Sequence, residues 1–281
     1  MRVGLIQMCS GEDVARNVDV AAGMIAEAAR AGAELIVTPE MTSILAPKRE
    51  ILEAALGDSD DGGAGEAFTA LARQLSVNLL IGSMAVKRPD GWLANRSMLF
   101  APDGGLVATY DKVHMFDVDL ADGESYRESR RYAAGKQLTV VDAAGARLGL
   151  SICYDMRFPA LYRRLAQAGA EIITVPSAFT VPTGEAHWHV LLRARAIETG
   201  AFILAPAQTG RHESGRQTYG HSLAVAPWGE ILADGGTDTG AIVVDIDLGK
   251  VGEARQRIAA LDHGREFKPF RSDDVLELAP S

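Results

Sequence analysis

Cysteine, long apolar runs and surplus positive charge are the features that this sequence lacks. Its 281 residues include only two cysteines, Cys9 and Cys153, which lie far apart and cannot form a disulfide framework. No apolar run approaches the roughly 18 residues that a membrane span needs, and no secretory signal pattern is found. These absences predict a protein of the reducing cytoplasm with no membrane partner.

Acidic residues outnumber basic residues in this sequence. Lys and Arg total 28 against 37 Asp and Glu, which gives a formal net charge of -9. Such a surface repels phosphate backbones, so nucleic acid is not expected as a partner. The remaining composition, 47% hydrophobic and 23% charged, is that of a globular protein and excludes fibrous and disordered chains.

Motifs for cofactors and metals are missing as well. No GxGxxG opens a helix after a strand, and no P-loop is present, so we expect no nucleotide cofactor. Four histidines suggest a metal site, namely His187, His189, His212 and His221. However, no HExxH or cysteine cluster accompanies them, and residues two apart on a helix do not share a face. We therefore expect neither a metal nor a cofactor.

The length suits one large α/β domain. We expect residues 1–281 to form it, with a polar C-terminal tail from about residue 262. Apolar runs and helical patterns alternate along the chain, separated by proline–glycine turns. The predicted strands are 3–8, 35–38, 77–86, 97–100, 106–110, 138–141, 147–152, 171–175, 202–205, 222–226, 231–233 and 241–246; the predicted helices are 13–31, 65–75, 159–168 and 185–199.

One internal echo bears on the architecture. AGAELIVTPE at 31–40 resembles AGAEIITVPS at 168–177, and both consist of a helix end, a glycine, an apolar strand and a proline. Two matching units predict a pseudo-symmetric, layered fold with two sheets, although common helix–strand patterns would also produce such an echo by coincidence. The polar segment 117–136 has little periodicity, which is typical of a functional loop.

Three reactive side chains follow predicted strands. Glu40 comes two residues after one strand, Lys112 two residues after another, and Cys153 directly follows a third. Taken singly, each has a structural explanation as a buried small side chain or a surface charge. In α/β folds, however, reactive groups gather beyond the carboxyl ends of strands, where the three side chains would lie close together.

Such a set can perform amide hydrolysis. A thiolate is the nucleophile, a nearby ammonium lowers the thiol pKa, and a carboxylate accepts its proton. The ammonium and a backbone N–H then stabilise the tetrahedral oxyanion. Attack releases an amine and leaves a thioester, which water hydrolyses. A cysteine–histidine pair is the rival arrangement, but the spacing selects none of the six histidines.

Three motifs resemble those of the nitrilase superfamily, the carbon–nitrogen hydrolases. TPEM at 38–41 is similar to its glutamate motif, YDKVHMFDVD at 110–119 to its lysine motif, and SICYDMRFP at 151–159 to its cysteine motif. The resemblance runs from the N-terminal strand to about residue 250. It implies an α-β-β-α sandwich whose subunits form a homodimer or a higher homo-oligomer.

The resemblance also implies roles for individual residues. Glu40 would be the general base, Lys112 the oxyanion stabiliser and Cys153 the nucleophile. A second glutamate that positions the lysine corresponds to Glu128, with Glu124 as the fallback. The backbone N–H of Tyr154 would complete the oxyanion hole.

Further segments resemble the Nit-type amidases, which hydrolyse amides of small dicarboxylic acids. These segments are CYDMRFP, PSAF, TGEAHWHVLLRARAIET, AQTGRH, YGHS and PWGE. AQTGRHESGR and the proline after Phe158 resemble amidases of deaminated glutathione more than ω-amidases. The implied reaction gives α-ketoglutarate and cysteinylglycine. An ω-amidase acting on α-ketoglutaramate or α-ketosuccinamate, an N-carbamoyl amide hydrolase, and a binding protein without turnover remain alternatives.

The distribution of basic side chains agrees with a small acidic amide as the partner. Despite the net charge of -9, arginines flank the predicted nucleophile, and a second basic group lies downstream. Arginine binds carboxylates in a bidentate manner, and Arg157 is our first choice for this role. The other basic candidates are Arg127, Arg130, Arg131, Arg211, His212 and Arg216. Tyr154, Phe179 and His187 are expected to line the pocket, whereas Trp188 suits either the pocket or the core.

Overall fold

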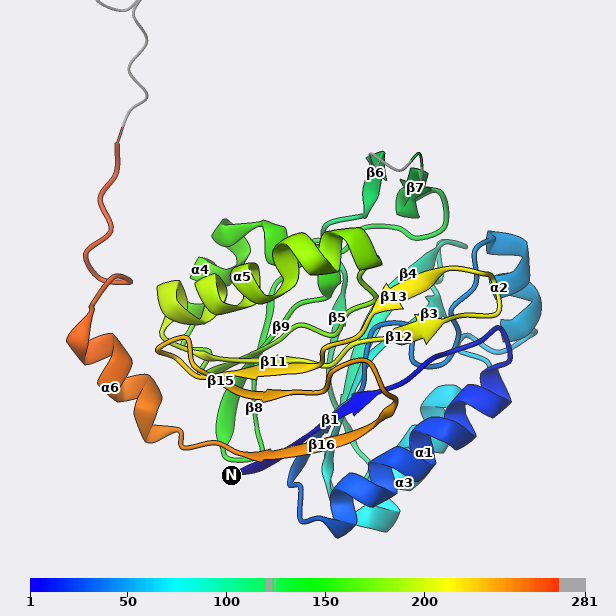
Figure 1. Ribbon diagram of the computed structural model, residues 1–281. Coiled ribbons are helices and arrows are strands. Elements are labelled where there is room, and N and C mark those ends of the chain that lie inside the picture. Colours follow the sequence, from blue (N-terminus) through cyan, green and yellow to red (C-terminus); the bar gives the residue numbers. More distant parts are fainter. Residues whose placement is uncertain (120–122, 124, 268–281) are drawn as a thin grey trace, which may run out of the picture.

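Two six-stranded sheets form the centre of the molecule (Figure 1). The computed structural model describes residues 1–119, 123 and 125–267. The first sheet has the order β16 (Gly240–Asp245), β1 (Arg2–Gln7), β2 (Leu35–Val37), β3 (Asn78–Lys87), β4 (Leu93–Phe100) and β5 (Leu106–Asp111). The second has the order β15 (Ile231–Asp234), β14 (Leu223–Val225), β11 (Phe202–Ala205), β10 (Ile172–Thr174), β9 (Ala146–Leu150) and β8 (Thr139–Ala143).

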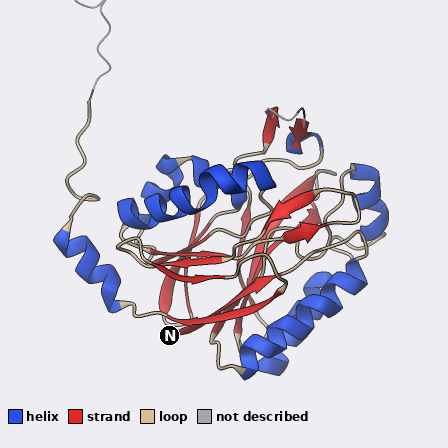
Figure 2. Ribbon diagram, in the orientation of Figure 1, coloured by secondary structure: helices blue, strands red, loops and turns tan. Residues whose placement is uncertain are grey.

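Helices cover the outer face of each sheet (Figure 2). Helices α1 (Val14–Arg30) and α3 (Ala64–Leu75) contact the first sheet, and α4 (Pro159–Gln167) and α5 (Val181–Thr199) contact the second. The alternation of side chains along β1 explains the layering: Val3 and Leu5 pack into the core between the sheets, and Ile6 packs toward α1. The expected α-β-β-α sandwich is confirmed.

The repeated sequence unit occupies equivalent places in the two sheets. β2 is parallel to β1 and β3, and β10 is parallel to β9 and β11. Each follows a helix that ends at a glycine with positive φ, Gly32 at 87° and Gly169 at 95°. Only glycine adopts this conformation without strain, so both helices stop at the same point before their strand. The echo therefore reflects a real structural repeat.

Smaller elements surround the sandwich. They are the helices α2 (Arg49–Leu56) and α6 (Gly249–Arg257), the hairpins β6 (Asp117–Asp119)–β7 (Ser125–Arg127) and β12 (Thr209–Arg211)–β13 (Gln217–Tyr219), and the single turns η1 (Glu128–Arg130) and η2 (Cys153–Arg157). The predicted loop at 117–136 thus contains a hairpin and η1. α5 begins at Val181 rather than at Glu185, because a proline at the second position of a helix is compatible with its first turn.

Among the described residues, no helix combines the length and apolar character that crossing a bilayer requires. Most of the predicted tail, residues 268–281, lies outside the described residues, as does Glu124.

Candidate active site

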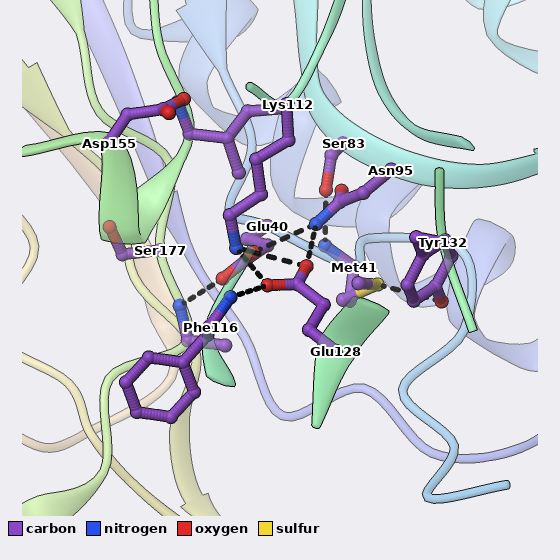
Figure 3. Close-up of polar contacts among 12 residues, drawn as sticks. Glu40, Met41, Ser83, Asn95, Lys112, Phe116, Glu128, Tyr132, Asp155 and Ser177 are labelled. Atoms are coloured by element: carbon purple, nitrogen blue, oxygen red, sulfur yellow. Dashed lines mark hydrogen bonds and ion pairs between the residues drawn. The ribbon is translucent and has the colours of Figure 1, made fainter. Parts of the chain in front are cut away.

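The residues predicted to be catalytic come together where the two sheets meet. Glu40 follows β2 and Lys112 follows β5, both in the first sheet, whereas Cys153 follows β9 of the second sheet. Glu128 begins η1, directly after the hairpin β6–β7. Figure 3 shows the side chains of Glu40, Lys112 and Glu128 converging. Each strand end therefore contributes one reactive group, as the sequence predicts.

Lys112 lies between two carboxylates. Its Nζ is 2.8 Å from Oε1 of Glu40, and 3.0 and 2.9 Å from Oε1 and Oε2 of Glu128. The lysine side chain is 1% exposed and each glutamate side chain 5%. Burial alone would lower the pKa of Lys112, but the charges of Glu128 and Glu40 raise it well above its usual value. Lys112 is therefore a fixed ammonium.

The ion pair with Lys112 also keeps Glu40 ionised. Burial would raise the pKa of Glu40, but the charge and hydrogen bond of Lys112 outweigh that effect and lower it. A hydrogen bond with the Cys153 thiol acts in the same direction. Glu40 is thus a carboxylate that lines the same pocket as the predicted nucleophile, which is the arrangement that a general base requires.

Cys153 holds its proton in this environment. Burial, followed by the charge of Glu40, raises the pKa of the Cys153 thiol more than Lys112 lowers it. The sequence predicts a lowered pKa beside an ammonium, and the structure reverses the net direction, because the Cys153 thiol is buried and lies near the Glu40 carboxylate. The thiol must therefore transfer its proton to Glu40 as it reacts.

The backbone presents Cys153 in a constrained turn. Its φ is 48°, in the left-handed region that non-glycine residues rarely adopt. Its N–H donates to the carbonyl oxygen of Pro176 at 2.9 Å, which ties the end of β9 to the segment after β10. Strained backbone of this kind persists where the surrounding structure fixes it, and often at functional sites.

Three further groups hold the carboxylates, and sequence reasoning missed all of them. The Asn95 amide on β4 donates to Oε1 of Glu40 at 2.9 Å and to Oε1 of Glu128 at 3.0 Å. The N–H of Ala178 donates to Oε2 of Glu40 at 2.9 Å, and the N–H of Phe116 donates to Oε2 of Glu128 at 2.7 Å. The one available signal was an asparagine beside an apolar strand pattern.

Asp155 joins the lysine motif to the cysteine motif. Its buried carboxylate accepts from the Tyr110 hydroxyl at 2.7 Å, the Ile152 N–H at 2.9 Å and the His114 N–H at 3.0 Å. The His114 ring lies 2.7 Å away through Nδ1. Because Tyr110 and His114 flank Lys112 in sequence, these bonds fix the backbone of the lysine relative to η2.

A pocket opens onto these groups, and we call it the inner pocket. Its cavity volume is about 40 Å³, below the roughly 300–1,000 Å³ usual for small-molecule sites. Its lining comprises Glu40, Met41, Lys112, Phe116, Tyr126, Glu128, Arg131, Cys153, Tyr154, Ala178, Phe179, Thr180, Thr183 and Arg216. Within the described part of the chain, no histidine lines it, which disfavours the cysteine–histidine arrangement.

Comparison with known proteins gives the family. A sequence model of the family described as carbon–nitrogen hydrolase matches residues 2–256. The chain belongs to the carbon–nitrogen hydrolase family. It is a hydrolase of carbon–nitrogen bonds, and its mixed α/β fold is that of the nitrilase superfamily.

Three similar proteins narrow the comparison within this family. A protein of Yersinia enterocolitica named deaminated glutathione amidase is 42% identical over 267 residues, 94% of this chain and 92% of its own. The NitFhit protein of C. elegans is 34% identical with a TM-score of 0.86, covering 94% of this chain and 65% of that longer one. Saccharomyces cerevisiae Nit3, a member of branch 10 of the nitrilase superfamily, is 28% identical with a TM-score of 0.82, covering 92% and 94%.

The predicted substrate-binding residues of this hydrolase divide into two groups. Tyr154 and Phe179 line the inner pocket. Arg157 lies beside it, with its guanidinium carbon 5.5 Å from the Phe179 ring centre and 5.9 Å from that of Tyr154. His187 is exposed, with Nδ1 at 3.3 Å from Nη2 of Arg157. Trp188, 1% exposed, belongs to the core.

Of the four histidines considered for a metal, His189 and His221 lie together beside Asp234, with their ligand atoms within 4.8 Å of one another. His212 is buried, with Nδ1 at 2.8 Å from the Ser10 carbonyl oxygen. His189 and His221 share Asp234, with Nε2 of His189 and Nδ1 of His221 at 3.0 and 2.9 Å from its two oxygens. The pKa of Asp234 is lowered, because hydrogen bonds from these rings and the Gly236 N–H outweigh its burial.

Proposed function

We propose that this hydrolase cleaves the amide bond of deaminated glutathione, giving α-ketoglutarate and cysteinylglycine through a Cys153 thioester. The observation that carries the proposal is the buried Glu40–Lys112–Glu128 cluster beside the Cys153 thiol. The names of relatives at up to 42% identity support the choice of substrate.

The first half-reaction forms the thioester. As Sγ of Cys153 attacks the amide carbon, the thiol proton passes to Glu40, and the carbonyl oxygen becomes an oxyanion. The Lys112 ammonium and the Tyr154 N–H stabilise this oxyanion. Glu40 then returns the proton to the amide nitrogen, the C–N bond breaks, and cysteinylglycine leaves as the free amine.

The second half-reaction regenerates the thiol. A water molecule transfers a proton to Glu40 and attacks the thioester carbon through the same oxyanion geometry. Collapse of the intermediate breaks the C–S bond, and the Glu40 proton returns to Sγ as α-ketoglutarate departs. One water is consumed, and no redox change or cofactor is involved.

Glu128 acts by positioning in this scheme. It accepts two contacts from Lys112 and is itself held by Asn95 and the Phe116 N–H. A lysine fixed from two sides keeps its ammonium in one place, which pre-organises the charge that the oxyanion needs.

The acyl part of the substrate carries an α-keto carboxylate, and we assign it to Arg157. Its guanidinium lies against the faces of Tyr154 and Phe179 at the pocket wall. Among the described residues, the neighbouring His187 is the only side chain that makes a polar contact with this guanidinium. A bound carboxylate would therefore meet guanidinium donors that no acidic side chain occupies.

The chain as a whole is proposed to be one domain over 1–281 with a tail from about 262, working in the cytoplasm as a homodimer or higher homo-oligomer. Exposed apolar side chains on α5 and near α6 support association: Val190 is 68% exposed, Ile197 53%, Trp228 49% and Ile258 58%. Light scattering coupled to size-exclusion chromatography tests the assembly, and a monomer at micromolar concentration would contradict it.

The decisive assay compares kcat/KM for deaminated glutathione and α-ketoglutaramate by α-ketoglutarate formation, with Cys153→Ala as the blank. A preference of about tenfold for deaminated glutathione corresponds to about 1.4 kcal/mol of transition-state binding and supports the proposal. The reverse preference makes the chain an ω-amidase. Turnover of N-carbamoyl amides alone, or of no amide, would support the remaining alternatives.

A further inference from the structure

A second, larger cavity adjoins the inner pocket, and we call it the outer hollow. Its volume is about 760 Å³, and it shares three lining residues with the inner pocket: Tyr126, Arg131 and Arg216. The rest of its lining comes from the start of α2, the strand β7 with η1, and the hairpin β12–β13. The inner pocket and the outer hollow thus meet at a wall that contains two arginines.

The outer hollow is strongly basic in a chain whose net charge is -9. Its lining contains one acidic residue, Glu50, against six cations: Lys48, Arg49, Arg127, Arg130, Arg131 and Arg216. Arg49 is paired with Glu53 and Arg127 with Asp119. In the described part of the chain the other four cations form no ion pair, so the hollow presents uncompensated positive charge.

Arg131 and Arg216 are anchored but incompletely bonded. Nη1 of Arg131 donates to the carbonyl oxygens of Ala46 and Pro47 at 3.2 and 2.8 Å, and Nη2 of Arg216 donates to that of Ala178. The Nε atom of each arginine is buried and, within the described residues, has no hydrogen-bond partner. Buried unpartnered donors are costly, and charged ones favour an anionic acceptor.

We propose that the outer hollow is the leaving-group subsite, in which Arg216 and Arg131 bind the terminal carboxylate of a dipeptide amine. This inference rests on the proposed function. The acyl part must remain at Cys153, so the amine part has to extend out of the inner pocket. Two extended residues span at most about 7 Å, which carries the terminal carboxylate of cysteinylglycine past the reacting centre toward the shared wall.

The positions of the arginines favour separate binding sites for the two carboxylates of the substrate. Both carboxylates of the substrate then meet separate arginines, Arg157 for the acyl part and the Arg131–Arg216 pair for the leaving group. An amide whose leaving group is ammonia uses only the first. The outer hollow therefore discriminates long substrates from short ones without changing the chemistry at Cys153.

The test is the effect of Arg216→Gln on two substrates. We expect kcat/KM for deaminated glutathione to fall by about 10- to 100-fold, mainly through KM, because a charge-assisted contact is lost. The fall for α-ketoglutaramate should be at least about five times smaller, and Arg216→Lys should restore part of the loss. Arg211→Gln is the matched control: it removes the same charge from the same hairpin, is exposed, and lines neither cavity.

Arg216 also donates to the Ala178 carbonyl oxygen, so Arg216→Gln could act through the structure of the site. A change of substrate separates that effect from loss of carboxylate binding. Deaminated glutathione with a C-terminal carboxamide should be as poor a substrate for the wild type as the acid is for Arg216→Gln, and the variant should lose nothing more on it. The subsite would be overturned if Arg216→Gln lowered kcat/KM equally for deaminated glutathione and α-ketoglutaramate. It would also be overturned if the wild type hydrolysed the carboxamide as well as the acid.

Failure of the proposed function remains distinguishable. Cysteinylglycine is then tested as an inhibitor of whichever small amide turns over. Inhibition that Arg216→Gln weakens supports the subsite even if deaminated glutathione is not hydrolysed. Hydrolysis of deaminated glutathione with no selective effect of Arg216→Gln leaves the function standing and removes the subsite.

Discussion

Glu40→Gln should make Cys153 easier to alkylate while slowing hydrolysis. The carboxylate raises the pKa of the thiol through its charge, and Lys112 opposes it. Replacing the carboxylate with a neutral amide leaves the ammonium as the dominant neighbour, so the thiol pKa should fall by about 1–3 units. At a pH below that pKa, each unit multiplies the thiolate population by about ten.

Hydrolysis should move in the opposite direction. Without a proton acceptor for the thiol and a donor for the leaving amine, kcat should fall by about 10²- to 10⁴-fold. Faster alkylation together with slower turnover separates proton transfer from thiolate formation, because a site that relied on a preformed thiolate would lose less activity.

The assay follows iodoacetamide labelling by mass spectrometry across pH, in a Cys9→Ser background because Cys9 is exposed. The wild-type labelling curve should have its midpoint above about 8.5, the pKa of a free thiol, and the Glu40→Gln curve should lie lower. A midpoint that stays the same or rises in the variant would refute the assignment of the proton to Cys153.

Three other substitutions test contacts described above: two in the catalytic cluster and one at Asp234. Glu128→Gln keeps the shape of the site but frees one side of Lys112, so kcat should fall by about 10²-fold with little change in KM; steady-state kinetics would expose an equal rise in KM as a contradiction. Asn95→Ala leaves both buried glutamates short of a donor and should lower the free energy of unfolding by about 1–3 kcal/mol in urea titrations, whereas an unchanged midpoint would deny the amide this role. The pKa of Asp234 is depressed in the fold, so its contribution is present at neutral pH and is lost as pH falls through the folded-state value; the stability gap between wild type and Asp234→Asn should narrow below about pH 4, and a constant gap would contradict it.

Much of the sandwich could be read from the chain because its central strands are short, apolar and buried on both faces. β2 and β10 each pair with parallel strands on both sides, and all of their residues are buried; every one of these residues is apolar except Thr174. The helix α1 was predictable for a similar reason: its buried residues recur at helical spacing, and Asp13 caps it by accepting from the Arg16 N–H.

Helix α6 and the hairpin β12–β13, which escaped prediction, carry little apolar periodicity. α6 buries only Val251 and Ala254 among charged neighbours, and the hairpin β12–β13 is mostly polar. Their formation depends on tertiary contacts, for example the Arg255 guanidinium donating to carbonyl oxygens of Thr199 and Ala170. No local pattern encodes such contacts.

The site divides in the same way. Glu40, Lys112 and Cys153 are marked by their positions after strands, so their convergence follows from topology. Asn95 and the backbone N–H groups of Ala178 and Phe116 depend on register and loop conformation, which the sequence does not reveal. The direction of the Cys153 pKa shift depends on burial and on two opposed charges at once, and only coordinates can weigh these against each other.

The reactive groups come from both sheets, and this affects how folding can be monitored. The strand ends of both sheets meet at Gly82 of β3, where any side chain would collide with the carbonyl oxygen of Thr38 and with Pro176. A chain in which each sheet had formed but the pair had not docked would therefore show native far-ultraviolet circular dichroism and no turnover. Specific activity in this enzyme therefore reports contact between its two sheets, which far-ultraviolet circular dichroism alone does not detect.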